Sequence, residues 1–286
     1  MRGQAGYTLI EVVVVVAITA LLAGLIGSFI TRPMQIYNDV GLRGELVAAA
    51  GSSLERIARE VRAALPNSVR VSAGGTALEL LHVADGARYR AAGGGAHTSA
   101  SDVIDLAGDA SFNVLGRFRE LSFSYGTPLA AGYRLSIYAT GSSVWSDAAS
   151  GANPGVITPA GTLLTLADDG DEDQIALSSA FRFALASPQE RLYVVDGPLS
   201  YVCDTAAGTL TRYSGYAVAS SQPTNPAVAP LSSVSAALLV DRVSSCSFSY
   251  TPGTPQRAAL VTIALGLARQ GEQVRLLEQV HVLNTP

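Results

Sequence analysis

The stretch "GYTLIEVVVVVAI", residues 6–18, decides the fold at the start of this chain. From residue 12 to residue 30 the sequence is apolar apart from glycine, threonine and serine. As a helix this run is about 28 Å long, close to the hydrocarbon thickness of a bilayer. Glu11 directly precedes it, and a charged side chain costs about 2.5–3.5 kcal/mol at the bilayer centre on insertion scales. The stretch therefore predicts a membrane helix whose acid needs a compensating interaction.

The composition of the whole chain excludes several classes of protein. The 286 residues carry a net charge of −4 and are 48% hydrophobic, enough for a buried core in one or two domains. All 19 basic residues are arginine, and they form no basic run with interleaved aromatic residues, which argues against nucleic-acid binding. Three scattered histidines and two cysteines outside any C-x-x-C pair argue against a zinc site.

Two ordinary interpretations of the N-terminus fit poorly. A removable secretory signal needs a basic start and a small-x-small cleavage site, but only Arg2 is basic, and a cut after Ala23 places Leu21 at the third position before the bond. An ordinary signal anchor leaves Glu11 unexplained. Its orientation is also undecided, because Arg2 and Arg32 flank the apolar run on opposite sides.

A third interpretation accounts for the acid. Residues 6–11, joined to the apolar run, resemble the class III leader of type IV pilins and type II secretion pseudopilins. The resemblance implies that a prepilin peptidase removes residues 1–6 by cutting between Gly6 and Tyr7, then methylates the new amino group of Tyr7. Tyrosine stands here where phenylalanine is usual. It also implies that Glu11 pairs with the terminal ammonium of a neighbouring subunit, an attraction that is strong at low dielectric and offsets desolvation.

The helix is predicted to continue beyond the membrane. We expect a membrane and assembly helix over residues 7–32 and an amphipathic continuation over 33–66, with a tolerated kink at Pro33. Pro66 ends it, because the residue before a proline avoids the helical region. Apolar residues recur at intervals of three, four or seven and form one stripe. They are Ile36, Val40, Val47, Leu54, Ile57, Val61 and Leu65.

Residues 67–286 are predicted to form a β-rich head outside the membrane. Asp85-Gly86 is expected to be the type I′ turn of a hairpin between strands 78–84 and 87–90. Further expected strands are 119–125, 133–139, 174–177, 191–195, 199–204, 209–217, 243–250, 259–267 and 274–284. Residues 91–101 and 141–161, the latter with Trp145, are expected to be long loops. The fold class is therefore α+β: a long N-terminal helix, membrane half plus amphipathic half, packed on an antiparallel β-sheet head.

The head also resembles those of minor pilins. The stretches that carry this resemblance are "ERIAREVRAALPNSVRV" (55–71), "GYRLSIYATG" (132–141), "RLYVVDGPLSYVCD" (191–204), "GTLTRYSGY" (208–216) and "HVLNTP" (281–286). They are similar to O-type minor pilins of the mannose-sensitive haemagglutinin (MSHA) pilus system. The similarity to J-type pseudopilins and W-type minor pilins is weaker.

Cys203 and Cys246 are expected to join the strands around residue 200 to the terminal strands. If the head is exported, the pair is expected to form a disulfide. Closing a loop of about 44 residues is worth about 4 kcal/mol by the loop-entropy relation. The alternative is two buried free thiols.

The densest charge cluster suggests one cofactor. Asp169, Asp171 and Asp173 alternate as the first ligands of a calcium loop do. The twelfth position from Asp169 is, however, Ala180 in place of glutamate, and Gly170 is early for the sharp turn. The alternative is a solvated acidic turn. Some pseudopilins bind calcium, so calcium is the one cofactor that the sequence and the resemblance suggest.

Taken together, these patterns predict a minor pilin or pseudopilin that initiates or caps a type IV pilus-like or type II secretion fibre. The implied partners are the prepilin peptidase, an inner-membrane assembly platform and other minor and major pilins. The chain is expected in the bacterial inner membrane with a periplasmic head, and afterwards in an extracytoplasmic fibre. A tip adhesin with an exposed aromatic pocket around Trp145 is one alternative. A membrane-anchored periplasmic enzyme is another, although the sequence has no G-x-S-x-G or H-E-x-x-H motif.

Overall fold

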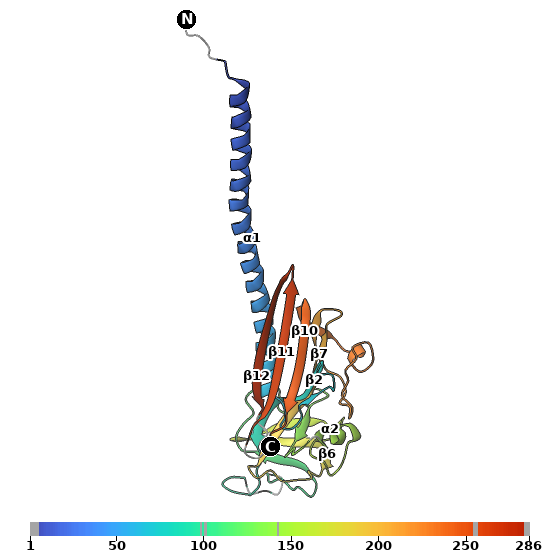
Figure 1. Cartoon of the computed structure of the whole chain (residues 1–286). Helices are drawn as coiled ribbons and strands as arrows, with labels where there is room; N and C mark the ends of the chain where they lie inside the picture. Colours follow the sequence, from blue (N-terminus) through green and yellow to red (C-terminus); the bar gives the residue numbers. More distant parts are fainter. Residues whose placement is uncertain (1–5, 98, 100–101, 142, 254–256, 283–286) are drawn as a thin grey trace.

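One long helix and a β-rich head make up the computed structural model, which describes residues 6–97, 99, 102–141, 143–253 and 257–282. The helix α1 (Leu9–Arg62) begins after Thr8 and continues through residue 33 without interruption. Its N-terminal half projects beyond the head (Figure 1), so that only its C-terminal part has strands beside it. The predicted leader, residues 1–6, lies outside the described residues except for Gly6.

Twelve described strands and two short helices form the head. They are β1 (Arg70–Val71), β2 (Ala77–Arg88), β3 (Asp109–Val114), β4 (Arg134–Ser136), α2 (Ser143–Ser150), β5 (Leu164–Asp169), β6 (Glu172–Phe181), β7 (Arg191–Asp204), β8 (Thr209–Ser214), η1 (Leu231–Ser233), β9 (Ala236–Asp241), β10 (Val243–Thr251), β11 (Ala259–Arg269) and β12 (Glu272–Val282). The end of the last predicted strand, residues 283–284, lies outside the described part of the chain.

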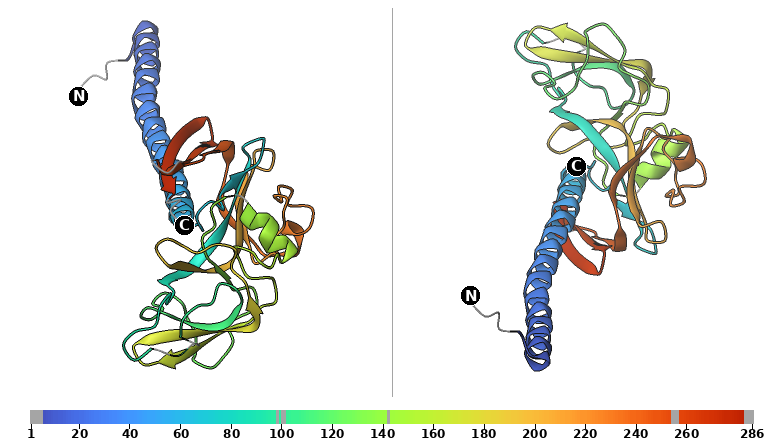
Figure 2. Two further views of the ribbon diagram at one scale, coloured as in Figure 1. Left: turned by 90° about the horizontal axis from the view of Figure 1, so that it is seen from below. Right: turned by 90° about the horizontal axis from the view of Figure 1, so that it is seen from above.

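The strands form three antiparallel sheets. The largest has the order β1-β2-β7-β8-β9, with β4 also paired to β7, and the others are β10-β11-β12 and β3-β6-β5. A long N-terminal helix followed by antiparallel sheets confirms the predicted α+β class. The strands β11 and β12 lie beside α1 in both views of Figure 2.

The helix shares a hydrophobic core with these strands. Its buried apolar residues are Leu46, Ala50, Leu54, Ile57, Ala58 and Val61, and they join a cluster with Val261, Ile263, Leu265 and Val280. Two ion pairs flank this core: Arg43 to Glu272 at 2.6 Å and Glu45 to Arg269 at 3.1 Å. The predicted stripe is thus buried only in its second half. Ile36 and Val40, which precede the contact of Arg43 with the head, are 62% and 64% exposed.

The predicted hairpin at Asp85-Gly86 is wrong, because β2 runs straight through both residues and pairs with β7. The Asp85 carboxylate accepts the backbone N–H groups of residues 119, 120 and 121 at 2.9, 2.8 and 3.1 Å. Through these contacts Asp85 holds a loop that is distant in sequence, and Asp85 itself does not form a turn. The contacts also explain why residues 119–125 are not the predicted strand: a side chain satisfies their first N–H groups.

The two strands predicted at 191–195 and 199–204 are one strand, β7, interrupted by neither Gly197 nor Pro198. Along one edge β7 pairs with β2. Along the other it pairs first with β4, up to Val195, and then with β8, from Leu199. Pro198 falls between these two partners, where the missing N–H costs no ladder hydrogen bond on that edge.

The predicted loop at 141–161 is also partly wrong, because it contains α2. Val144, Trp145 and Ala148 form the buried face of α2, at helical spacing. Trp145 is only 3% exposed, and its indole N–H donates to the Ser68 carbonyl at 2.8 Å. Local sequence patterns also did not predict β1, β3, β5 and β9, which are short strands that depend on their neighbours for pairing.

Candidate functional site

The residues ahead of α1 are open to solvent. Gly6 and Tyr7 are not helical, and the Tyr7 side chain is 83% exposed. Thr8 has an extended backbone and caps the helix: its Oγ1 accepts the Glu11 N–H at 3.4 Å. The bond predicted to be cut therefore lies in an accessible, non-helical segment directly before a capped helix.

Glu11 occupies the third helical position after the cap, a role that the sequence analysis missed. The pattern Thr8-x-x-Glu11 is that of a capping box, in which the glutamate lies close to the unsatisfied N–H groups of the first turn. A carboxylate there also interacts favourably with the helix dipole, typically by about 0.3–1 kcal/mol. This local role belongs to the isolated chain and leaves the predicted contact with a second subunit open.

The start of α1 presents apolar side chains in every direction. Its segment Leu9–Ile26 has a mean hydropathy of 2.8 over 18 residues, and none of it is buried in the structure. A helix that is apolar all round is stable only in hydrocarbon or surrounded by other apolar helices. By length and composition this segment is the one candidate membrane span among the described residues.

Residues 1–27 match the family model of the prokaryotic N-terminal methylation motif. The match supports a type IV pilin-like protein. It covers the leader and the apolar half of α1, and it points to a structural subunit that is processed by a prepilin peptidase and assembles with other pilins. No curated protein and no solved structure matches the chain.

The head of this pilin-like chain brings the two cysteines together. Cys203 lies on β7 and Cys246 on β10, and their thiols, both reduced in this structure, hydrogen-bond to each other. The bond lowers the pKa of Cys203 and raises that of Cys246, because the Cys246 S–H stabilises a Cys203 thiolate. The disulfide itself stays a prediction.

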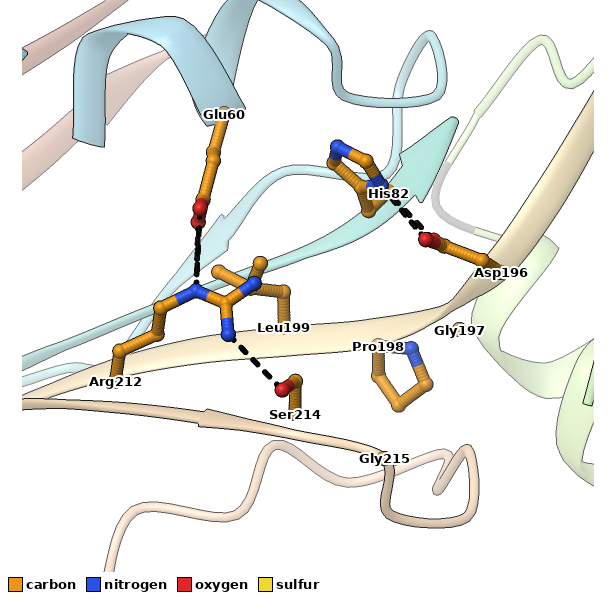
Figure 3. A pocket seen from close by; sticks show the side chains of 9 residues that line it. All are labelled: Glu60, His82, Asp196, Gly197, Pro198, Leu199, Arg212, Ser214 and Gly215. Carbon is orange, nitrogen blue, oxygen red and sulfur yellow. Dashed lines mark hydrogen bonds and ion pairs between the residues drawn. The ribbon is translucent and has the colours of Figure 1, made fainter. Parts of the chain in front are cut away.

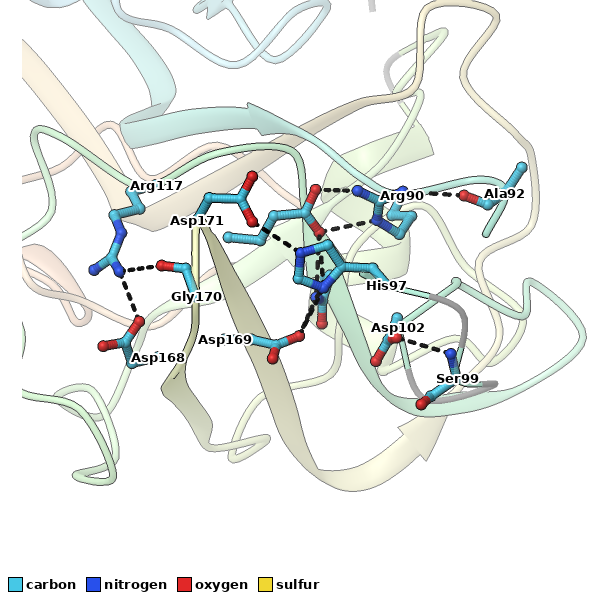
Figure 4. A network of polar contacts seen from close by, with 12 residues as sticks. Arg90, Ala92, His97, Ser99, Asp102, Arg117, Asp168, Asp169, Gly170 and Asp171 are labelled. Atoms are coloured by element: carbon cyan, nitrogen blue, oxygen red, sulfur yellow. Dashed lines mark hydrogen bonds and ion pairs between the residues drawn. The ribbon is translucent and has the colours of Figure 1, made fainter. Parts of the chain in front are cut away.

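The three predicted calcium ligands do not face one common point. Asp169 and Asp171, at the β5–β6 turn, both contact His97: Asp169 Oδ2 lies 3.0 Å from Nδ1 and Asp171 Oδ1 lies 2.9 Å from Nε2. Figure 4 shows both carboxylates pointing at the ring. Asp173 is fully buried and accepts the Phe118 N–H at 2.8 Å and the Tyr125 hydroxyl at 2.7 Å. Calcium binding by this set stays a prediction.

Other buried polar groups surround His97. Glu172 is 4% exposed and forms a two-pronged ion pair with Arg90. Asn113 on β3 is fully buried and donates to Asp169 at 2.7 Å. Ligand atoms of His97, Asp102 and Asp169 lie within 4.8 Å of one another, which makes these three residues a candidate metal-binding group. No local pattern predicted His97, Asp102 or Asn113 as part of this cluster, because they precede its other acids by more than fifty residues.

Electrostatics in this cluster follow from these contacts. Hydrogen bonds to Asp171 and then Asp169 raise the pKa of His97, and the Asn113 amide together with His97 lowers the pKa of Asp169. The Arg90 guanidinium lowers the pKa of Glu172. The lowered pKa values of Asp169, Asp171 and Glu172 keep these three carboxylates ionised at neutral pH, so they attract positive charge.

A second polar site is a cavity of about 280 Å³ at the gap between β4 and β8 along β7. Its lining residues are Glu60, His82, Asp196, Gly197, Pro198, Leu199, Arg212, Ser214 and Gly215. Figure 3 shows two separate pairs: His82 directed to Asp196 at 2.9 Å, and Arg212 directed to Glu60 at 3.0 Å. Ser214, the one hydroxyl among the described lining residues, accepts from Arg212, a permanent cation that cannot act as the base a nucleophile needs.

Proposed function

We propose that this chain is a minor pilin or pseudopilin that initiates or caps a type IV pilus-like or type II secretion fibre. The observation that carries the proposal is the arrangement at the N-terminus: an exposed Gly6-Tyr7 segment, a capped helix start with Glu11, and the apolar segment Leu9–Ile26, none of which is buried. The head of the same chain does not cover this apolar helix segment. The segment can therefore leave the bilayer only if it packs against the corresponding helices of other subunits.

In this proposal the peptidase cuts between Gly6 and Tyr7 and methylates the Tyr7 amine. Glu11 then pairs with the terminal ammonium of an adjacent subunit. Both charges enter a low-dielectric fibre core, so each needs the other. Before assembly the chain is a single-pass inner-membrane protein with a periplasmic head, and the assembly platform and other minor and major pilins are its partners.

The first experiment identifies the mature N-terminus. The chain is expressed in a host with a prepilin peptidase, and its N-terminal peptide is sequenced by mass spectrometry. We expect a chain that begins with N-methylated Tyr7. An intact Met1 in a chain that still inserts into the membrane contradicts the proposal and favours an ordinary anchor.

The second experiment separates the two roles of Glu11. In Glu11→Gln the amide retains the capping-box pattern, which accepts glutamate or glutamine, but the charge is lost. In the matched variant Thr8→Ala the cap is lost and the charge retained. We expect Glu11→Gln to be cleaved normally yet lost from fibres, and Thr8→Ala to be incorporated. The reverse pattern would show that capping, not pairing between subunits, explains the glutamate.

The MSHA O-type assignment is a finer part of the same proposal, supported by the resemblances along the head. Co-purification with the minor pilins of an MSHA system supports it, whereas capture only with type II secretion pseudopilins favours the J type.

The two alternative functions have less support. An adhesin was expected to show an exposed aromatic pocket around Trp145, but this side chain is buried beneath Arg70, whose guanidinium carbon lies 3.8 Å from the ring centroid. An enzyme was expected to show a cleft with converging titratable groups. The cavity at His82 holds such groups, but they are engaged in two ion pairs.

A further inference from the structure

The side chain of Asn113 is unusual within the acidic cluster of the head. It is fully buried, and its Oδ1 accepts no hydrogen bond from any described residue. Its Nδ2 lies 2.7 Å from Asp169 Oδ2, 3.2 Å from Glu172 Oε2 and 3.3 Å from His97 Nδ1. Leaving a buried amide oxygen unpaired costs about 1–3 kcal/mol, so this arrangement calls for an explanation.

Hydrogen bonds within the cluster do not satisfy the Asn113 amide in either of its two orientations. As described, the oxygen is unpaired and the amide nitrogen lies 3.3 Å from a ring nitrogen that must itself donate to Asp169. If the amide turns by 180°, Oδ1 takes the place of Nδ2. It is then able to accept from His97, but it lies about 2.7 Å from the Asp169 carboxylate, where two acceptors repel.

A cation removes the repulsion in the turned orientation, because it binds both oxygens. With the amide turned, Asn113 Oδ1, Asp169 Oδ2 and His97 Nδ1 are separated by 2.7–3.3 Å. Neighbouring ligands on a cation with bonds of about 2.0–2.3 Å are about 2.8–3.3 Å apart at right angles. A carboxylate oxygen of Asp102 lies within 4.8 Å of the His97 and Asp169 atoms and adds a fourth donor.

The surroundings of His97 match those of a metal ligand. A ligating histidine commonly donates its other ring N–H to a carboxylate, which fixes the tautomer. Here Nε2 lies 2.9 Å from Asp171 Oδ1, which leaves Nδ1 to face the other donors. Glu172 is engaged by Arg90 through both oxygens, so it contributes charge and not a ligand atom.

The donor set and the charge indicate the class of cation. One imidazole nitrogen among oxygen donors suits Zn²⁺ or Mn²⁺ better than Ca²⁺, which takes oxygen ligands. With neutral His97, the described residues of the cluster include four carboxylates, those of Asp102, Asp169, Asp171 and Glu172, and the guanidinium of Arg90. A divalent cation offsets most of this excess of negative charge.

We propose that His97 Nδ1, the carboxylates of Asp102 and Asp169, and Asn113 Oδ1 form a binding site for a divalent transition-metal cation, Zn²⁺ or Mn²⁺. The site ties the β5–β6 turn to the segment between β2 and β3, at the end of the head away from the membrane helix. It shares Asp169 with the predicted calcium loop, but Asp171 orients the histidine and Asp173 takes no part. The site is independent of whether the chain enters a fibre.

The test is a Mn²⁺ titration of the full chain in detergent micelles after removal of metal with a chelator. Electron paramagnetic resonance measures free Mn²⁺, and Zn²⁺ is added as a competitor. We expect one saturable Mn²⁺ site, from which added Zn²⁺ displaces Mn²⁺. We expect the affinity for Mn²⁺ to be at least about tenfold weaker in Asp169→Asn and His97→Gln than in wild type. Asp168→Asn is the matched control: it lies in the same strand, pairs with Arg117 at the surface and is expected to bind as wild type.

A further variant guards against effects of misfolding. Asn113→Asp adds a third ligand carboxylate to those of Asp102 and Asp169, so we expect tighter Mn²⁺ binding together with a lower melting temperature in chelator, which Mn²⁺ restores. If Asn113 acts only as a hydrogen-bond donor, the variant melts equally low with and without Mn²⁺.

Two other results overturn the proposal. One is the absence of saturable Mn²⁺ or Zn²⁺ binding at millimolar levels by folded wild-type chain. The other is binding of any of these cations, Ca²⁺ included, that Asp169→Asn and His97→Gln leave unchanged.

Discussion

The thiols of Cys203 and Cys246 hydrogen-bond to each other across the boundary between the largest sheet and the β10-β11-β12 sheet. In an oxidising compartment we expect this contact to become a disulfide. It closes a loop of about 44 residues, so we expect a Cys203→Ser/Cys246→Ser variant to be less stable than the oxidised chain by about 4 kcal/mol.

Chemical unfolding of the full chain in micelles measures this difference. A reductant is expected to lower the stability of wild type toward that of the double variant and to leave the variant itself unchanged. Two titratable thiols in chain exported and purified without reductant would falsify the disulfide.

The contact between the helix and the head is tested by two residues of the same predicted stripe. Ile57 is fully buried and Val40 is 64% exposed. We expect Ile57→Ala to cost about 2–5 kcal/mol, because it opens a cavity between α1 and the strands. Val40→Ala is expected to change the unfolding free energy by less than about 0.5 kcal/mol. Equal losses in chemical unfolding would mean that the helix is not held through its second half.

The ion pair between Arg70 and Glu79 stabilises the head from inside. Glu79 is fully buried, its Oε2 lies 2.6 Å from Arg70 Nε, and Tyr216 donates to its other oxygen at 2.9 Å. Removing one partner of a buried pair leaves an uncompensated charge, so we expect Arg70→Met to cost about 3–5 kcal/mol. Arg242→Met, which breaks an exposed pair with Asp241, is the control and is expected to cost less than about 1 kcal/mol.

The same variant has a defined pH dependence. Burial raises the pKa of Glu79 against the opposing effect of Arg70, so without Arg70 the folded chain takes up a proton more readily than the unfolded chain. Stability that depends on this proton is present at low pH and is lost as pH rises through the raised pKa. The defect of Arg70→Met is therefore expected to shrink on acidification. A defect that grows toward low pH contradicts this account.

The cavity beside β7 contains a second titrating pair. The hydrogen bond to Asp196 raises the pKa of His82, with Glu60 and Arg212 as the other charged neighbours. The pair contributes its stability below the ordinary histidine pKa of about 6.5 and loses it as pH rises through the raised value. We expect His82→Gln to cost about 0.2–1 kcal/mol at acidic pH and nothing at alkaline pH, because both side chains are partly exposed. Asp196→Asn should give the same profile, whereas a defect of equal size at both pH values argues for a packing role.

Local sequence patterns were sufficient to predict the long helix α1 and several strands. The apolar run before residue 30 and the Pro66 stop predicted a helix that spans Leu9–Arg62 in the structure. The terminal strands β10, β11 and β12 were predicted with small errors at their ends. The predicted strand at 209–217 corresponds to β8, which ends at Ser214. Each of these depends on side chains that are close together in sequence.

Turn signals failed where a distant partner competed for the same residues. Asp85-Gly86 and Gly197-Pro198 both read as breaks, yet both lie within long paired strands. In the first, the aspartate satisfies three N–H groups more than thirty residues away. At Gly197-Pro198, one edge of β7 changes its partner from β4 to β8, and a proline is accommodated at this point. Neither partner is visible in a short window of sequence.

The sequence by itself determined that this chain carries a prepilin-like leader pattern, Glu11 and a long apolar helix, because hydropathy and helical spacing are local properties. Only the tertiary structure decided which acids converge. It separated Asp173 from Asp169 and brought His97, Asp102 and Asn113 to Asp169 instead. Sheet pairing between β3, β5 and β6 sets these neighbours, and such long-range pairing depends on burial across the whole head, which no local pattern encodes.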